Sequence, residues 1–148
     1  MRIIAFIVLM IFCNSCFLFS DFKRSPFSYS WNGVHHALDL VVPKGFIKTQ
    51  NQVDSTGNQI QYYYYPGSTV LYFALLKDTT TQMQPINYNL NIPKELYHTV
   101  FFKGIDSSYQ YWRETRFDHY RAGYKNVKEG KDGTFDSSIN YFSLHVKH

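Results

Sequence analysis

Two β-forming runs lie on either side of a three-residue turn, and they limit the possible fold more than any other segment. Residues 60–65 and 69–76 consist almost entirely of residue types that favour strands. Between them, Pro66 and Gly67 suit the two central positions of a tight turn. The pattern predicts an antiparallel hairpin. Because both faces of each run are apolar or aromatic, we expect this hairpin in the middle of a sheet, covered on one side by a helix.

The composition agrees with a globular domain that is rich in strands. The 148 residues include 13 Phe, 13 Tyr and 2 Trp, and aromatic residues favour strands. With 45% hydrophobic residues, 18% charged residues and a net charge of +4, the chain is too apolar to be disordered. The longest basic run is Lys23-Arg24, so we expect no binding to nucleic acid.

The remaining periodic segments predict an α+β domain. Residues 38–42, 109–117 and 120–127 have the alternation of strands, and charges on both faces of the last two indicate an outer position. Residues 50–59 and 77–91 are expected to be exposed loops. Near the C-terminus, apolar residues recur at helical spacing after a potential cap at Thr134. We therefore expect an antiparallel sheet of five to seven strands with one C-terminal amphipathic helix, from about residue 135 to 146, packed on it.

The N-terminus has the features of an export signal. Arg2 precedes ten uncharged apolar residues, 3–12, which is the length of a signal-peptide core. The segment Cys13-Asn14-Ser15-Cys16 follows, with a small residue directly before the second cysteine. Residues 2–16 resemble a bacterial lipoprotein signal, although Cys13 stands where an aliphatic residue is usual. The resemblance implies cleavage before Cys16 and attachment of lipid to Cys16.

Two alternatives to the lipoprotein signal stay open. Residues 3–19 carry no charge, so they could act as an uncleaved signal anchor. Ordinary secretory cleavage after Ser15 is the other alternative. All three interpretations export the domain. The predicted organisation is a signal peptide at 1–15, a lipidated cysteine and tether at 16–34, and a single domain at 35–148.

Aromatic and amide side chains form the candidate binding surface. Tyr109, Tyr111 and Trp112 lie on one predicted strand, and Asn87 and Asn89 lie in the long polar loop. Tyr and Trp suit contacts with a protein or glycan partner, because their rings are apolar and their tips polar. The alternative is that most aromatic rings simply fill the core.

Histidine and aspartate residues are the leading candidates for catalysis, and Glu114 with Asp118 is a weaker pair of carboxylates for glycosidase chemistry. An envelope-polymer hydrolase would use His36, Asp39, Asp118 or His119. The same residues with His35 could supply metal ligands, but they match no known ligand spacing, and His35 and His36 point to opposite faces of a strand. We assign no catalytic residue, metal or cofactor from the sequence, and we favour a protein that is not an enzyme.

Several short segments are informative as a set: Val42-Pro43-Lys44-Gly45-Phe46, Tyr65-Pro66-Gly67-Ser68 with Leu71-Tyr72, Tyr111-Trp112-Arg113-Glu114, Gly123-Tyr124-Lys125-Asn126-Val127 and Phe135-Asp136. In these segments the chain resembles the small uncharacterised lipoproteins of Bacteroidota. Those proteins have no assigned activity, so the resemblance implies only a cellular location. We expect a lipid-anchored protein of the bacterial cell envelope, in the outer membrane, with a non-enzymatic binding domain whose partner is an envelope protein or a glycan.

Overall fold

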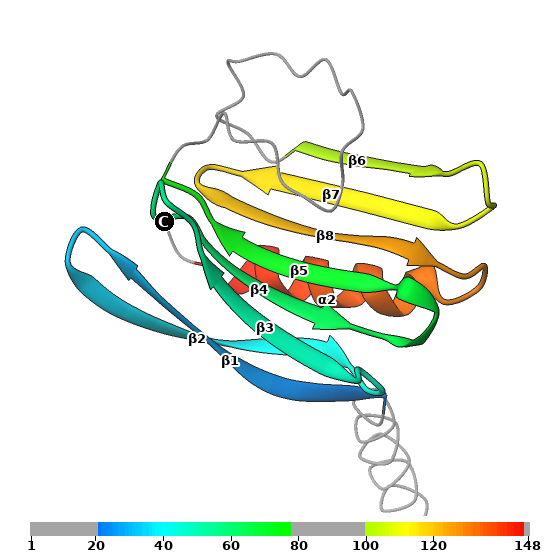
Figure 1. Cartoon of the computed structure of the whole chain (residues 1–148), viewed down its shortest axis with the longest axis horizontal. Helices are drawn as coiled ribbons and strands as arrows, with labels where there is room; N and C mark the ends of the chain where they lie inside the picture. The colour runs from blue at the N-terminus through cyan, green and yellow to red at the C-terminus, as the bar shows by residue number, and fades with distance from the viewer. Residues whose placement is uncertain (1–20, 78–99, 147–148) are drawn as a thin grey trace, which may run out of the picture.

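The computed structural model describes residues 21–77 and 100–146, which form antiparallel strands and one C-terminal helix (Figure 1). The elements are β1 (Phe22–Trp31), β2 (Val34–Pro43), β3 (Lys48–Val53), β4 (Gln59–Tyr64), the 3₁₀ turn η1 (Pro66–Ser68), β5 (Val70–Leu75), β6 (Val100–Ile105), β7 (Tyr111–Phe117), β8 (Tyr120–Val127) and α2 (Asp132–His145). The expected antiparallel architecture with a C-terminal helix is confirmed. The strands form two sheets where the sequence analysis expected one.

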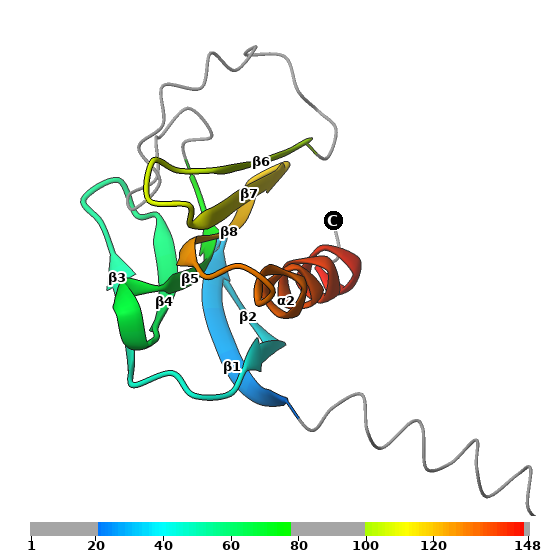
Figure 2. The ribbon, with the colours of Figure 1, turned by 90° about the vertical axis from the view of Figure 1, so that its right-hand side faces the viewer.

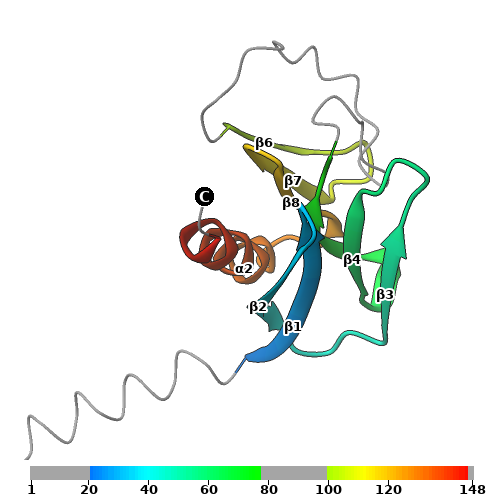
Figure 3. The same cartoon turned by 90° about the vertical axis from the view of Figure 1, so that its left-hand side faces the viewer.

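The larger sheet has six strands in the order β3-β4-β5-β8-β7-β6, and the smaller one is the β1-β2 hairpin. Both α2 and the β1-β2 hairpin lie on the same side of the six-stranded sheet (Figures 2 and 3). There α2 contacts β2, β7 and β8. The fold therefore contains more β-structure than the predicted single sheet with one C-terminal helix.

The predicted hairpin is confirmed as β4 and β5, with Tyr62 opposite Tyr72. Gly67 adopts φ 74° in the connecting turn, a conformation that glycine takes without steric cost. β5 also pairs with β8, so the hairpin reaches the middle of the sheet as expected.

Apolar side chains gather on both faces of the six-stranded sheet. The helix-side core contains Phe27 of β1, Leu40 of β2, Tyr63 of β4, Phe73 of β5 and Phe142 of α2. The opposite-face cluster consists of Ile60, Tyr62, Val70, Tyr72, Ala74 and Leu76. Since strand side chains alternate between faces, the aromatic runs of β4 and β5 supply both groups.

Residues 22–31 are a strand in the structure, and the predicted tether is wrong for them. β1 pairs with β2 over its whole length, from Phe22 opposite Pro43 to Trp31 opposite Val34. Phe27 is 2% exposed and Tyr29 is 9% exposed, so β1 belongs to the core. Pro26 misled the prediction, yet proline is compatible with a strand at the edge of a sheet.

Three other features of the fold differ from the prediction: the length of β3, the position of β7 and β8 in the sheet, and the start of α2. β3 extends through Val53, so the expected loop at 50–59 is only the turn between Val53 and Gln59. β7 and β8 are inner strands, and β6 forms the edge. α2 begins at Asp132, and its N-cap position is Lys131, which makes no side-chain capping bond, so Thr134 lies inside the helix.

The predicted apolar stripe of α2 is confirmed, because Phe135, Ile139 and Phe142 are buried. No helix in the described part of the chain is long and apolar enough to cross a bilayer. The signal segment, Cys16 and most of the predicted loop at 77–91 lie outside the described residues.

Candidate binding pocket

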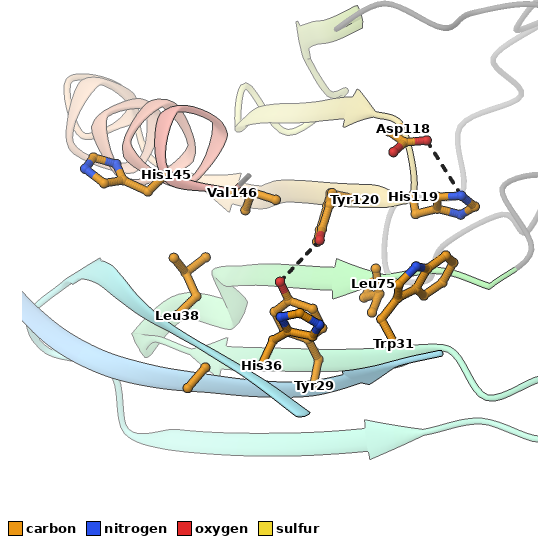
Figure 4. A pocket seen from close by; sticks show the side chains of 11 residues that line it. Tyr29, Trp31, His36, Leu38, Leu75, Asp118, His119, Tyr120, His145 and Val146 are labelled. Carbon is orange, nitrogen blue, oxygen red and sulfur yellow. Dashed lines mark hydrogen bonds and ion pairs between the residues drawn. The ribbon is translucent and has the colours of Figure 1, made fainter. Parts of the chain in front are cut away.

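A pocket of about 510 Å³ opens where the β1-β2 hairpin meets the β7-β8 turn and the end of α2 (Figure 4). Pockets of a few hundred cubic ångströms are the usual size for small ligands. Its polar lining comes from four parts of the chain: Tyr29 of β1, His36 of β2, Asp118 and His119 of the β7-β8 turn with Tyr120 of β8, and His145 of α2. Trp31, Leu38, Leu75 and Val146 supply apolar surface.

A tyrosine pair joins the hairpin to the sheet within this pocket. The hydroxyl oxygens of Tyr29 and Tyr120 lie 3.2 Å apart, so one phenol donates a hydrogen bond to the other (Figure 4). Burial, followed by the hydrogen bond to Tyr29, raises the pKa of Tyr120. His36 stacks on Tyr29, with ring centroids 5.1 Å apart. These contacts fix the hairpin over β8.

His119 is held by the tight turn between β7 and β8. Its Nδ1 lies 3.0 Å from the backbone oxygen of Leu76. Because a carbonyl only accepts hydrogen bonds, Nδ1 carries the proton, and Nε2 of the neutral ring is an acceptor. Nε2 lies 3.7 Å from Oδ1 of Asp118. The ring also contacts the indole of Trp31, with centroids 4.5 Å apart.

The structure brings together three of the four residues proposed for a hydrolase. His36, Asp118 and His119 all line the pocket, whereas Asp39 instead forms an exposed ion pair with Arg24 at 3.6 Å. The 3.7 Å between Asp118 and His119 is longer than a hydrogen bond. Nowhere in residues 21–77 and 100–146 do three His, Cys, Asp or Glu side chains gather in a metal-binding arrangement.

The predicted aromatic surface is divided among different environments. Tyr109 is 84% exposed in the turn after β6. Tyr111 packs against the helix-side core, while Trp112 packs against the opposite-face cluster. The three rings therefore do not share one face, and Asn87 and Asn89 lie outside the described residues.

Among the aromatic and imidazole side chains of the pocket, sequence reasoning missed four, namely Tyr29, Trp31, Tyr120 and His145. The signal for the first two was the spacing of Phe27, Tyr29 and Trp31, which places alternate residues on one face of a strand. His145 approaches the pocket only because α2 packs along β2, a tertiary relationship that no local pattern contains.

A polar cluster also lies buried on the opposite face of the sheet. The carboxylate of Glu114 accepts hydrogen bonds from the Tyr72 hydroxyl and the Arg116 guanidinium. Glu114 and Tyr72 are both fully buried. Burial, followed by the nearby charge of Glu114, raises the pKa of Tyr72 well above its usual value. Because Glu114, Tyr72 and Arg116 satisfy one another's hydrogen-bonding groups, we assign this cluster to the packing of β5, β7 and β8.

No protein-family model, curated protein or solved structure matches this chain significantly.

Proposed function

We propose that this is a lipid-anchored protein of the bacterial cell envelope, in the outer membrane, whose domain binds an envelope component in the pocket between the β1-β2 hairpin and β8. The lipoprotein-like segment at residues 2–16 supports the anchor, with Cys16 as the lipidated residue. One observation carries the binding role. Segments distant in the sequence bring aromatic, imidazole and carboxylate side chains to one cavity.

The pocket suits recognition better than covalent catalysis. Its lining combines apolar rings with a few polar tips, as ligand sites do. None of the described lining residues is a serine, threonine or cysteine that His119 could activate as a nucleophile. The partner would be an envelope protein or a glycan.

The anchor is tested by the intact mass of the mature protein and by membrane fractionation. We expect the native chain to begin at Cys16, to carry acyl mass and to sediment with membranes. Cys16→Ala should lose the acyl mass. A native chain that retains Met1 or lacks acyl mass would contradict the anchor.

The binding role is tested in cells by photo-crosslinking from a chosen position. A photoreactive amino acid at His36 faces the pocket, while the same amino acid at Val53, which is 69% exposed at the end of β3, provides the matched control. We expect an envelope adduct from position 36 that position 53 does not give. Equal capture at both positions, or none from position 36, would reject the pocket as the binding site.

One observation favours hydrolysis as the second candidate function. Nε2 of His119 is an acceptor beside the Asp118 carboxylate, so it could take a proton from a water molecule. The purified protein would then cleave envelope polymer, and His119→Gln would abolish the cleavage. Absence of turnover by the native chain removes this candidate.

A further inference from the structure

We propose that the ligand of this pocket is a neutral sugar ring of an envelope glycan, held by its hydroxyl donors and by its apolar C–H face. This inference rests on the proposed binding function and specifies the chemistry of the ligand. It follows from the hydrogen-bonding capacity of the lining and from the position of the aromatic rings.

The pocket presents more acceptors than donors. Nδ1 of His119 is occupied by the carbonyl of Leu76, and Nδ1 of His145 lies 2.8 Å from the carbonyl of Tyr141. Both imidazoles therefore carry the proton on Nδ1 and present Nε2 as an acceptor when neutral. The carboxylate of Asp118, half exposed, adds acceptor oxygens. A ligand that complements this lining must bring several donors.

Donors are fewer. One phenol of Tyr29 and Tyr120 donates to the other, so the pair keeps one further phenol proton, and the lining adds the indole N–H of Trp31 and a ring N–H of His36. A sugar hydroxyl both donates and accepts, so a sugar can donate to acceptors such as Asp118 and His119 and accept from the donors of the lining. A phosphate or carboxylate ligand would bring only acceptors beside Asp118, which is unfavourable.

Apolar surface lies next to these polar groups. Trp31 projects from the end of the hairpin against His119, and Leu38, Leu75 and Val146 line the pocket (Figure 4). A pyranose ring has hydroxyl groups at its rim and an apolar C–H face, so it matches both kinds of surface at once. A purely apolar ligand would displace water from the Asp118 carboxylate and offer it no hydrogen bond in exchange, which costs free energy.

The test measures binding of defined probes to the full-length protein, purified in a detergent without a sugar headgroup. Saturation-transfer NMR and calorimetry would compare cellobiose and N,N′-diacetylchitobiose with tetramethylammonium and glucuronate. We expect binding of at least one neutral disaccharide and weaker binding of both charged probes. Binding of only a charged probe would overturn the sugar assignment.

Two variants and one control locate the binding. Trp31→Ala should weaken sugar binding about tenfold, which corresponds to about 1.4 kcal/mol, and Trp31→Phe should retain most of the affinity, because phenylalanine keeps an apolar ring face. Asp118→Asn keeps a side chain that tolerates the φ of 51° at this position but replaces one acceptor oxygen with a donor, and should also weaken binding. Val53→Ala should bind as the native protein does. Sugar affinity unchanged in both pocket variants would overturn the assignment.

The outcomes separate this inference from the proposed function. Crosslinking from position 36 without binding of any sugar probe rejects the sugar and leaves the binding role standing. Absence of crosslinking from position 36 rejects the binding role itself. A crosslinked adduct that is a protein without glycan also rejects the sugar.

Discussion

The hydroxyl of Tyr72 donates a hydrogen bond to Oε2 of Glu114, at 3.1 Å, across the backbone of Gly123. Gly123 pairs with Tyr72 on one side and with Glu114 on the other. A Cβ atom at position 123 would lie 2.6 Å from the Tyr72 hydroxyl and 2.7 Å from the backbone oxygen of Arg113. The missing side chain of Gly123 thus leaves the space in which β5 contacts β7 across β8.

Gly123→Ala should destabilise the protein by about 1–3 kcal/mol, because the methyl group overpacks a site bounded by rigid backbone. Urea unfolding followed by circular dichroism measures the change. The control is Gly133→Ala in α2, where a Cβ meets nothing within 4 Å. That variant should be stabilised by about 0.5–1 kcal/mol, since alanine is the better helix former. Equal effects of the two substitutions would contradict the packing described for Gly123.

Stability should fall steeply above pH 10. Burial raises the pKa of Tyr62 to about 12, and burial also raises the pKa values of Tyr65, Tyr72, Tyr120 and Tyr124. Phenols with a raised folded-state pKa stabilise the fold fully below pH 10, and this contribution is lost as the pH rises toward the folded-state values. Urea unfolding at pH 8 and pH 11 tests the sign.

A single phenol can be removed to check this alkaline effect. Tyr62→Phe deletes one of these ionisable groups, so the loss of stability between pH 8 and pH 11 should be smaller than in the native protein. Tyr109→Phe, at a residue that is 84% exposed, should leave the loss unchanged. Identical pH dependence in the native protein and Tyr62→Phe would refute the explanation.

The ion pair between Arg113 and Asp136 should stabilise the contact between β7 and α2. Their side chains meet at 2.8 Å and are 12% and 24% exposed. Arg113 also donates to Asn140, at 2.9 Å. A double-mutant cycle with alanine at both positions should give a coupling free energy of about 1–2 kcal/mol. The exposed pair of Arg24 and Asp39 should give less than about 0.5 kcal/mol.

Trp112 should be needed for stability, whereas Tyr109 should not. The indole of Trp112 covers Gly104 on the neighbouring strand, where a Cβ would lie 2.9 Å from its Nε1. Trp112→Ala should cost about 2–3 kcal/mol in unfolding free energy, because it removes buried apolar area. Tyr109→Ala, at an exposed turn, should change stability by less than about 0.5 kcal/mol. The reverse order of the two effects would contradict the packing described for Trp112.

The first strand should be essential to the fold. Phe27 packs against Phe142 of α2, with ring centroids 6.4 Å apart. Phe27→Ala should cost about 3–5 kcal/mol, as expected for a buried phenylalanine. The neighbouring Ser28 faces solvent, so Ser28→Ala should have little effect. Equal stability of Phe27→Ala and Ser28→Ala would contradict a core role for β1 and would favour the predicted tether.

Local patterns in the sequence were sufficient for the elements that carry strong periodicity. The β4-β5 hairpin and the stripe of Phe135, Ile139 and Phe142 were predicted correctly, because each depends on neighbours in the sequence. β1 was missed because Pro26 and the interspersed serines obscure the alternation of its apolar residues. Its place in the core depends on pairing with β2 and packing on α2, which are not local properties.

The pocket illustrates the same limit for function. His36, Asp118 and His119 were recognised as residue types with chemistry, but nothing in their spacing predicts that a hairpin places His36 near the β7-β8 turn. Asp39, three residues after His36, is directed into an exposed ion pair instead. Tyr29 and Trp31 could be assigned to the site only after residues 22–31 were known to be a strand.

If Cys16 carries lipid as proposed, the start of β1 at Phe22 limits how far the domain can stand from a membrane. With acyl chains on Cys16, only six peptide steps separate the lipid from the first strand, and a fully extended chain of that length spans about 20 Å. The protein would therefore remain beside the bilayer headgroups, and it could meet only those partners that come to the membrane surface.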